Sequence, residues 1–358
     1  MINNYLSPIN EIIKDAKRGK MFILVDDKNR ENEGDLIMPG AKCNSKNVNF
    51  MAMHGRGLIC LALTKKQVDR LCLPLMSSVN KARMQTAFTV SIEAKKGITT
   101  GISAFDRAKT IRVAINPKTK KNEIVSPGHV FPLVARNGGV LERAGHTEAS
   151  VDISKLAKIN PSAVICEVMN EDGRMARYDD LIKFSKKHKL KIASIEDLIS
   201  YRLKNEKLVN LTSSKLLKIK KYGKFDIKTF KSKLDGSEHF AITKGKFKFN
   251  KSTRVRVIST NIINNIINFN KKLLDSSLKY LSKYNNFALI LIKDQNLSSF
   301  KMTTDKRKSN NILRYYGIGA QIIKDLKINN MILVSRSKKK IIGLDGYGIK
   351  IKKQEIIK

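Results

Sequence analysis

The sequence predicts a chain of two domains, each combining α-helices with β-strands. The chain has 358 residues, 42% of them hydrophobic, which is enough for two separate cores. Helical and strand-like apolar patterns alternate along it. The charge balance also changes, because residues 1–210 carry 36 basic and 22 acidic side chains whereas residues 211–358 carry 34 and 9. We therefore expect one domain at 1–207 and a second at 208–358.

The first half begins with two well-marked elements. In residues 9–19 the apolar side chains recur at helical spacing, and the segment ends at a glycine. Residues 21–27 form a short apolar run ending in two acids, which is typical of a buried strand that leads into a loop. Further strands are expected at 57–63, 86–92 and 163–169, and further helices at 103–115, 146–158 and 196–205. In the second half we expect strands at 254–260, 286–293 and 329–335 and a helix at 317–327.

Composition bounds the partners and the compartment. The net charge of +39 comes from 53 Lys and 17 Arg, whereas nucleic-acid surfaces typically combine arginine with aromatic side chains, so nucleic-acid binding is disfavoured. The apolar run 287–292 is too short to cross a bilayer, and residues 1–20 lack the apolar core of a signal peptide. The four cysteines form no CxxC pair and are interpreted as buried thiols of a reducing compartment. We expect a cytoplasmic protein.

Acidic side chains are concentrated directly after the strand predicted at 21–27. Within ten positions the chain carries Asp26, Asp27, Glu31, Glu33 and Asp35. Crowded carboxylates raise one another's pKa unless cations offset them, and Arg30 supplies one positive charge. A divalent ion would supply more, and oxygen ligands suit Mg²⁺. The alternative is a solvated acidic turn.

A second cluster lies in the glycine-rich segment 127–152. Arg143 and Thr147 bracket Gly145 and His146 where a helix is expected to begin, and a helix N-terminus with such side chains suits a phosphate group. His146 is a candidate metal ligand, and His129 a candidate acid or base. A structural role is the alternative for each histidine.

One carboxylate stands inside an apolar strand. Glu167 lies in AVICEVM, where burial favours a raised pKa and a role in proton transfer. A salt bridge is the alternative interpretation. Taken together, the residues indicate a Mg²⁺-dependent enzyme that acts on a small phosphorylated substrate.

Several long motifs occur in one order and carry a resemblance over residues 5–204. They are DDKNRENEGDLI, HGRGLICLAL, TAFTVSIEAKKGITTGISAFDRAKTI, PGHVFPLVARNGGVLERAGHTEASVD and CEVMNEDGRMAR. This half resembles 3,4-dihydroxy-2-butanone 4-phosphate synthase, a lyase in which ribulose 5-phosphate loses C4 as formate and leaves the four-carbon precursor of riboflavin. The resemblance implies an α+β fold and a homodimer with its active site near the subunit interface.

The resemblance also implies roles for individual residues. Glu31 and His146 would bind Mg²⁺, with Mn²⁺ as the alternative ion, and His129 and Glu167 would be essential to proton transfer. Glu33 and Asp27 would support the metal-binding and proton-transfer residues from just outside the direct contacts. The sugar phosphate would be held by Arg30, Glu31, Asp35, Arg143, Ala144, Gly145, His146, Thr147 and Glu167.

The second half resembles GTP cyclohydrolase II, an α/β domain, most clearly over residues 313–351. That family holds zinc with three cysteines, but residues 211–358 contain none. The family's Gly-Arg-rich segment is replaced by DQNLSSF, and Ile312 stands where the family has an Asp, two residues before Arg314. We therefore expect a degenerate domain without zinc or cyclohydrolase activity, which stabilises the dimer or contacts another riboflavin-pathway enzyme. The alternative is an RNA- or nucleotide-binding module.

Overall fold

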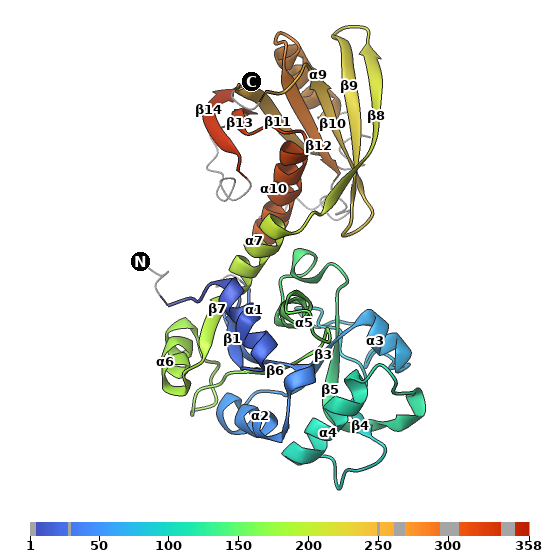
Figure 1. Ribbon diagram of the computed structural model, residues 1–358, viewed down its shortest axis with the longest axis vertical. Helices are drawn as coiled ribbons and strands as arrows, with labels where there is room; N and C mark the ends of the chain where they lie inside the picture. The colour runs from blue at the N-terminus through green and yellow to red at the C-terminus, as the bar shows by residue number, and fades with distance from the viewer. Residues whose placement is uncertain are drawn as a thin grey trace. The chain divides into compact units, whose positions relative to one another are not determined.

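The structure is a computed structural model with two compact units, Met1–Tyr201 and Arg202–Lys358 (Figure 1). It describes residues 5–27, 30–248, 251–260, 269–293, 308–337 and 348–357. Each unit contains a seven-stranded sheet together with helices. The predicted two-domain α+β architecture is confirmed.

The sheet of the first unit has the strand order β4-β5-β3-β6-β2-β1-β7. Its strands are β1 (Phe22–Val25), β2 (Gly34–Pro39), β3 (Cys60–Thr64), β4 (Ile92–Ala94), β5 (Ile124–Ala135), β6 (Ala163–Glu167) and β7 (Lys191–Ser194). β1 runs parallel to β7, and β3 parallel to β5. β2 lies antiparallel between β1 and β6, so the loop after β1 and the end of β6 come to the same edge.

Helices cover both faces of this sheet. They are α1 (Ile9–Arg18), α2 (Ser45–Phe50), α3 (Lys65–Arg70), α4 (Ala104–Ile115), α5 (His146–Leu156) and α6 (Tyr178–His188). A further helix, α7 (Ile195–Asn205), begins in this unit and ends in the second. On one face Ile111 of α4 joins Leu36 and Leu61 of the sheet in the main core. On the other face α5, most of whose side chains are buried, packs across five strands, and its Val151 meets Ala62.

The local sequence accounts for about half of these elements. The predicted helices at 9–19, 103–115, 146–158 and 196–205 and the strands at 21–27, 57–63 and 163–169 are confirmed within a few residues. Gly19, at φ 73°, ends the first helix as its sequence indicates. The sequence patterns did not identify β2, β5, β7, α2, α3 or α6. The buried-cysteine interpretation fails for Cys72, which is exposed.

The strand predicted at 86–92 is wrong, because only Ile92 belongs to a strand. Residues 87–89 touch β5 through two bonds, from the Thr89 amide to the Pro132 carbonyl at 3.0 Å and from the Val134 amide to the Ala87 carbonyl at 2.9 Å. Pro132 has no N–H to return a bond, so the ladder does not continue.

The sheet of the second unit has the order β14-β13-β11-β12-β10-β9-β8. Its strands are β8 (Val209–Ile219), β9 (Gly223–Ser232), β10 (Glu238–Lys244), β11 (Thr253–Thr260), β12 (Phe287–Lys293), β13 (Asn330–Ser335) and β14 (Lys350–Ile356). The helices α9 (Phe269–Leu281) and α10 (Lys308–Asp325) accompany them. The strands predicted at 254–260, 286–293 and 329–335 are confirmed, and the helix predicted at 317–327 forms the end of α10, which stops at Asp325.

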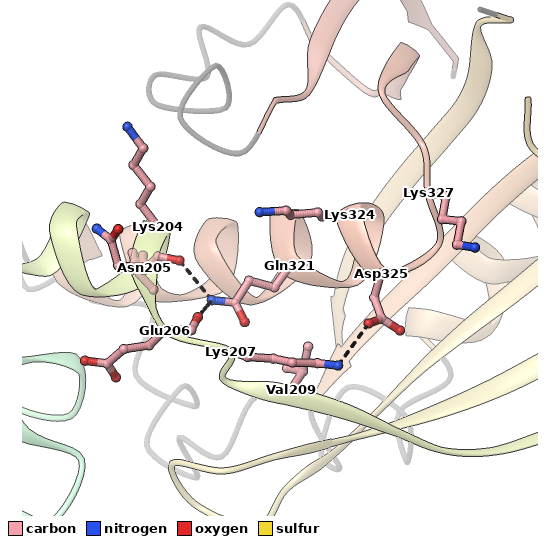
Figure 2. A pocket seen from close by; sticks show the side chains of 10 residues that line it. Lys204, Asn205, Glu206, Lys207, Val209, Gln321, Lys324, Asp325 and Lys327 are labelled. Carbon is pink, nitrogen blue, oxygen red and sulfur yellow. Dashed lines mark hydrogen bonds and ion pairs between the residues drawn. The ribbon is translucent and has the colours of Figure 1, made fainter. Parts of the chain in front are cut away.

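The end of α10 holds the chain that leads into β8. Gln321 donates from Nε2 to the carbonyls of Leu203, at 2.9 Å, and Glu206, at 2.7 Å (Figure 2). Its Oε1 accepts from the Leu208 amide at 2.7 Å. Gly317 permits the approach, because a Cβ there would lie 2.4 Å from a methyl group of Leu203. The YGIGAQ motif therefore has a structural role in this chain.

A hollow of about 400 Å³ lies beside this contact (Figure 2). Its two acids already have cationic partners, because Asp325 lies 3.5 Å from Lys207 and Glu206 lies 2.7 Å from Arg202. Both acids at the border of the hollow are therefore held in ion pairs.

We expect Gln321→Ala to lower the unfolding free energy of the second unit by at least about 2 kcal/mol. The change leaves two carbonyls and an amide without their partner, and each unsatisfied buried group costs about 1–3 kcal/mol. Urea unfolding of the full chain measures the effect. Lys324→Ala, an exposed change on the same helix, is the matched control and should cost less than about 0.5 kcal/mol. Equal losses in both variants would contradict the assigned role.

Candidate active site

The acidic loop, residues 26–33, lies between β1 and β2. Its described residues, 26–27 and 30–33, fold around the side chain of Asp26. The Asp26 amide donates to the Glu33 carbonyl at 3.1 Å, which continues the ladder of the two strands. The Asp26 carboxylate accepts from the amides of Glu31, at 3.1 Å, and Glu33, at 2.9 Å. Asp26 is only 9% exposed. The Asp26 carboxylate therefore stabilises the turn of the loop and fixes the position of the Glu31 backbone.

Two arginines offset the charge of the acidic loop. Arg30 Nη1 lies 2.8 Å from Asp26 Oδ2 and also contacts the carboxylate of Glu31. Arg177, at the start of α6, donates to two carbonyls of the loop at 2.7 and 2.8 Å and lies 3.5 Å from Glu33 Oε1. Burial, aided by the neighbouring Glu31, raises the pKa of Glu33. Sequence reasoning missed Arg177, whose one signal was its place at the end of the CEVMNEDGRMAR motif.

His146 begins α5 and is buried against the same edge of the sheet. It is 7% exposed, and its Nδ1 lies 3.6 Å from Asp35 Oδ1. Its Nε2 is buried without a hydrogen-bond partner among the residues that the structure describes. Burial lowers the pKa of His146 to about 4. The imidazole is therefore neutral at ordinary pH, which is the form that binds a metal ion.

Three side chains of this region have the arrangement of a metal site. Single ligand atoms of Asp26, Glu31 and His146 all lie within 4.8 Å of one another. Two carboxylates and one imidazole suit a divalent cation such as Mg²⁺ or Mn²⁺, and the unpartnered Nε2 of His146 supplies a free lone pair. The residues therefore fit the ion expected from the sequence, with Asp26 added to the predicted pair.

Asp35 and Glu167 lie side by side on neighbouring strands. They are directly opposite each other in the β2–β6 ladder. Their neighbours Leu36 and Cys166 point into the main core, so the two carboxylates point to the face that α5 covers. Burial, followed by the charge of Glu167, raises the pKa of Asp35 well above its usual range, and burial likewise raises that of Glu167. Such a pair readily shares and transfers a proton.

The carboxylate of Glu167 has a tightly fitted seat. Its Oε2 accepts from the Leu58 amide at 2.9 Å. A Cβ at Gly57 would lie 2.5 Å from the Glu167 carbonyl oxygen and 2.6 Å from Oε2. Gly57, the second glycine of HGRG, is therefore needed for the chain to approach Glu167. Sequence reasoning did not detect this role of the glycine.

The segment proposed to bind phosphate stands at the start of α5. Arg143 Nη1 donates to Glu148 Oε2 at 2.6 Å, and its Nη2 donates to Thr86 Oγ1 at 2.9 Å. Gly145 packs under this guanidinium, because a Cβ there would lie 2.4 Å from it. Ala144 lies between them, and the buried Thr147 follows in the first turn, next to His146. Arg143 is thus held rigidly beside the first amides of α5.

His129 stands apart from the acidic loop. It lies on β5, with 43% of its side chain exposed, and its partner among the described residues is Glu93 of β4, whose carboxylate contacts Nδ1. Sequence reasoning did not identify Glu93. The structure thus brings Arg30, Glu31, Asp35, His146 and Glu167 to one edge of the sheet and leaves His129 on a different strand.

The histidine of the second unit, His239, is buried and hydrogen-bonded. His239 is 1% exposed; its Nδ1 accepts from the Lys293 amide at 3.2 Å, and its Nε2 lies 3.3 Å from Ser237 Oγ. It is a hydrogen-bonded core residue. Residues 261–268 and the DQNLSSF segment, together with the side chains of Ile312 and Arg314, lie outside the described part of the chain.

Comparison with protein-family models gives two matches that together cover nearly the whole chain. Residues 10–201 match the 3,4-dihydroxy-2-butanone 4-phosphate synthase model. The chain belongs to the 3,4-dihydroxy-2-butanone 4-phosphate synthase family. Residues 211–356 match the GTP cyclohydrolase II model. The chain is thus a synthase of riboflavin biosynthesis fused to a cyclohydrolase II domain.

Known relatives share this two-domain length. A riboflavin biosynthesis protein RibBA from Aquifex aeolicus is 43% identical and aligns with 98% of this chain and 92% of its own length. A synthase from Photobacterium phosphoreum is 41% identical, with 97% and 98% covered. The crystal structure of RibBX, a two-domain synthase from A. baumannii, superposes with a TM-score of 0.83 at 37% identity, covering 98% of this chain and 99% of that one.

A further solved structure bears on the metal. A synthase in complex with two magnesium ions is 39% identical and superposes with a TM-score of 0.54, covering 56% of this chain and 98% of its own. Dependence of this family on a divalent ion agrees with the donor set of Asp26, Glu31 and His146.

We expect Gly57→Ala to impair the seat of Glu167. The added methyl group would lie 2.5 Å from a backbone oxygen that cannot simply rotate away. Overpacking of this kind costs about 1–3 kcal/mol of unfolding free energy, and turnover should fall with it. The matched control is Gly319→Ala, where the nearest atom would be a side-chain methyl of Ile292 at 3.3 Å. Normal stability and turnover of Gly57→Ala would contradict this close fit.

Proposed function

We propose that the first unit converts D-ribulose 5-phosphate to L-3,4-dihydroxy-2-butanone 4-phosphate and formate with Mg²⁺ or Mn²⁺. The observation that carries the proposal is the cluster of Asp26, Glu31 and His146 beside the Asp35–Glu167 pair. A metal donor set and a pair of carboxylates with raised pKa values are what a sequence of enolisation, dehydration and rearrangement requires.

Each side chain has a proposed task. Glu31 and His146, joined by Asp26, would hold the ion, which when bound stabilises negative charge on adjacent substrate oxygens. Glu167 would exchange a proton with substrate while the Leu58 amide fixes one of its oxygens. Asp35, opposite Glu167 in the ladder, would accept or return that proton.

The substrate phosphate would lie at the start of α5. Arg143, with the first amides of α5, the Thr147 hydroxyl and Arg30, would hold it, because a helix N-terminus and guanidinium groups both favour an anion. Gly145 and Ala144 would let the phosphate approach the backbone. His129 would be a second residue of proton transfer.

The remaining proposals concern the assembly and the second domain. We propose a cytoplasmic homodimer. The domain boundary proposed from the sequence, 207/208, lies a few residues after the division of the compact units at 201/202. The second domain would lack cyclohydrolase activity and zinc, and would serve the dimer or a pathway partner. A catalytic zinc needs three protein ligands and an open position, whereas residues 211–358 contain no cysteine and one histidine, the hydrogen-bonded His239.

Glu31→Ala and His146→Ala should each lower formate release from ribulose 5-phosphate by about a hundredfold or more, because each removes a proposed ligand of the ion. Calorimetric titration with Mg²⁺ and Mn²⁺ should show the loss of binding directly. Glu171→Ala is the control, since the Glu171 side chain is 82% exposed and, among the described residues, pairs only with Arg56, at 3.5 Å. Near-normal turnover in either ligand variant would refute the metal assignment.

The full chain, supplied with Zn²⁺ and GTP, should release pyrophosphate no faster than a metal-free control. The physical reason is the missing set of thiolate ligands for a metal-bound water. The same preparation must release formate from ribulose 5-phosphate, which shows that the protein is folded and active. Zinc-dependent pyrophosphate release above the control would overturn the proposed inactivity of the second domain.

A further inference from the structure

We propose that Glu93 is a positioning residue for His129, holding the imidazole through Nδ1 so that Nε2 is presented for proton transfer. The inference rests on the proposed function, in which His129 takes part in proton transfer. Glu93 lies in no predicted site, and its role follows from how the chain packs around it. The contact itself joins Glu93 Oε1 to His129 Nδ1.

The register between β4 and β5 brings the two side chains together. Ile92 is paired with Val130, but the next residue, Glu93, is paired with Val125, so the ladder jumps at this point. The residues of β5 that are skipped form a bulge that contains His129. Bulges of this kind re-aim a side chain, and here the imidazole is turned over the Glu93 carboxylate.

Glycines enclose the carboxylate of Glu93 on two sides. A Cβ at Gly128 would lie 2.3 Å from the Ile92 carbonyl and 2.5 Å from Glu93 Cγ. A Cβ at Gly101, whose φ is +89°, would lie 1.6 Å from Glu93 Oε1. Backbone therefore touches Glu93 where any other residue would collide with it, and the carboxylate has little freedom to swing away.

A buried aspartate fixes the loop that carries Gly101, one of the two glycines that pack against Glu93. Asp106, at the start of α4, accepts from the Thr99 hydroxyl at 2.7 Å, the Thr99 amide at 3.2 Å and the Gly101 amide at 3.1 Å. The bond from the Thr99 hydroxyl is the main cause of a lowered pKa of Asp106, so its carboxylate is ionised and a strong acceptor. The loop that carries Gly101 is thereby held against Glu93.

Ser91 fixes the backbone at Gly128, the other glycine that packs against Glu93. Its hydroxyl accepts from the Gly128 amide at 3.0 Å, and its carbonyl accepts from the Ser126 hydroxyl. Both bonds tie the bulge of β5 to the strand that carries Glu93. Glu93 and His129 are therefore held by two independent sets of contacts.

This arrangement has a chemical consequence. A carboxylate that accepts from Nδ1–H selects the tautomer with a lone pair on Nε2 and stabilises positive charge on the ring when Nε2 takes up a proton. An exposed ion pair without function would be the simpler interpretation. Against it, only 15% of the Glu93 side chain is exposed, and glycine backbone shapes its surroundings.

The test combines kinetics with a direct view of the ring. Glu93→Gln keeps the shape of the side chain and removes its charge; we expect kcat to fall by about tenfold to a hundredfold with KM changed by less than about threefold. In a His129→Ala background the same change should have no further effect on the residual activity. Glu123→Gln, an exposed glutamate just before β5, is the matched control and should be silent.

Nitrogen NMR of His129 in the full chain reports the tautomer without reference to activity. We expect Nδ1 to carry the proton in the parent protein and a mixture of tautomers in Glu93→Gln and Glu93→Ala. Thermal unfolding of each variant confirms that the fold is retained. An unchanged tautomer in Glu93→Ala, or an equal loss of kcat with and without His129, would overturn the inference. Normal turnover of His129→Ala would instead refute its proposed proton-transfer role, and the NMR result would still decide whether Glu93 holds the ring.

Discussion

The arrangement of the first unit depends on gathering buried carboxylates at one edge of a sheet. Asp26, Glu31, Glu33, Asp35 and Glu167 repel one another, and burial raises the pKa of the last three. Arg30 and Arg177 offset part of this charge through contacts with the loop. The remaining negative charge, facing a neutral imidazole, favours a divalent cation. In a chain with a net charge of +39, this edge of the sheet stands out because it concentrates acidic side chains.

The sheet converts sequence-distant residues into one site. β2 lies between β1 and β6, so the hairpin that carries the acidic loop also places Asp35 opposite Glu167. The same pleat that turns Leu36 and Cys166 into the core turns these two carboxylates toward α5. The first residue of α5 is His146, whose burial keeps it unprotonated. The strand pairing and helix packing that form the core therefore also bring the site residues together.

The second unit shows how a motif can persist for structural reasons. Gly317 and Gln321 of the YGIGAQ segment hold the chain between α7 and β8 through a close approach and three hydrogen bonds. Arg254 lies beside Glu355 at 2.9 Å and stacks on Tyr284, which ties β11 to β14 and to the turn that follows α9. These contacts belong to a folded domain, so the residues that make them have a structural role that requires no catalytic chemistry. Among the described residues, no helix of either unit is long and apolar enough to span a membrane.

The sequence by itself predicted α1 from its helical spacing and β6 from its apolar run, and its long motifs in register indicated the candidate site residues. It did not reveal β5, because Pro127, Gly128 and Pro132 argue locally against a strand that only its neighbours stabilise. Arg177 and Glu93 also became recognisable only in three dimensions, as did the contacts of Asp26 with the amides of its own loop. Their roles arise from hydrogen bonds and strand registers between segments up to 146 residues apart, and no local pattern encodes such pairings.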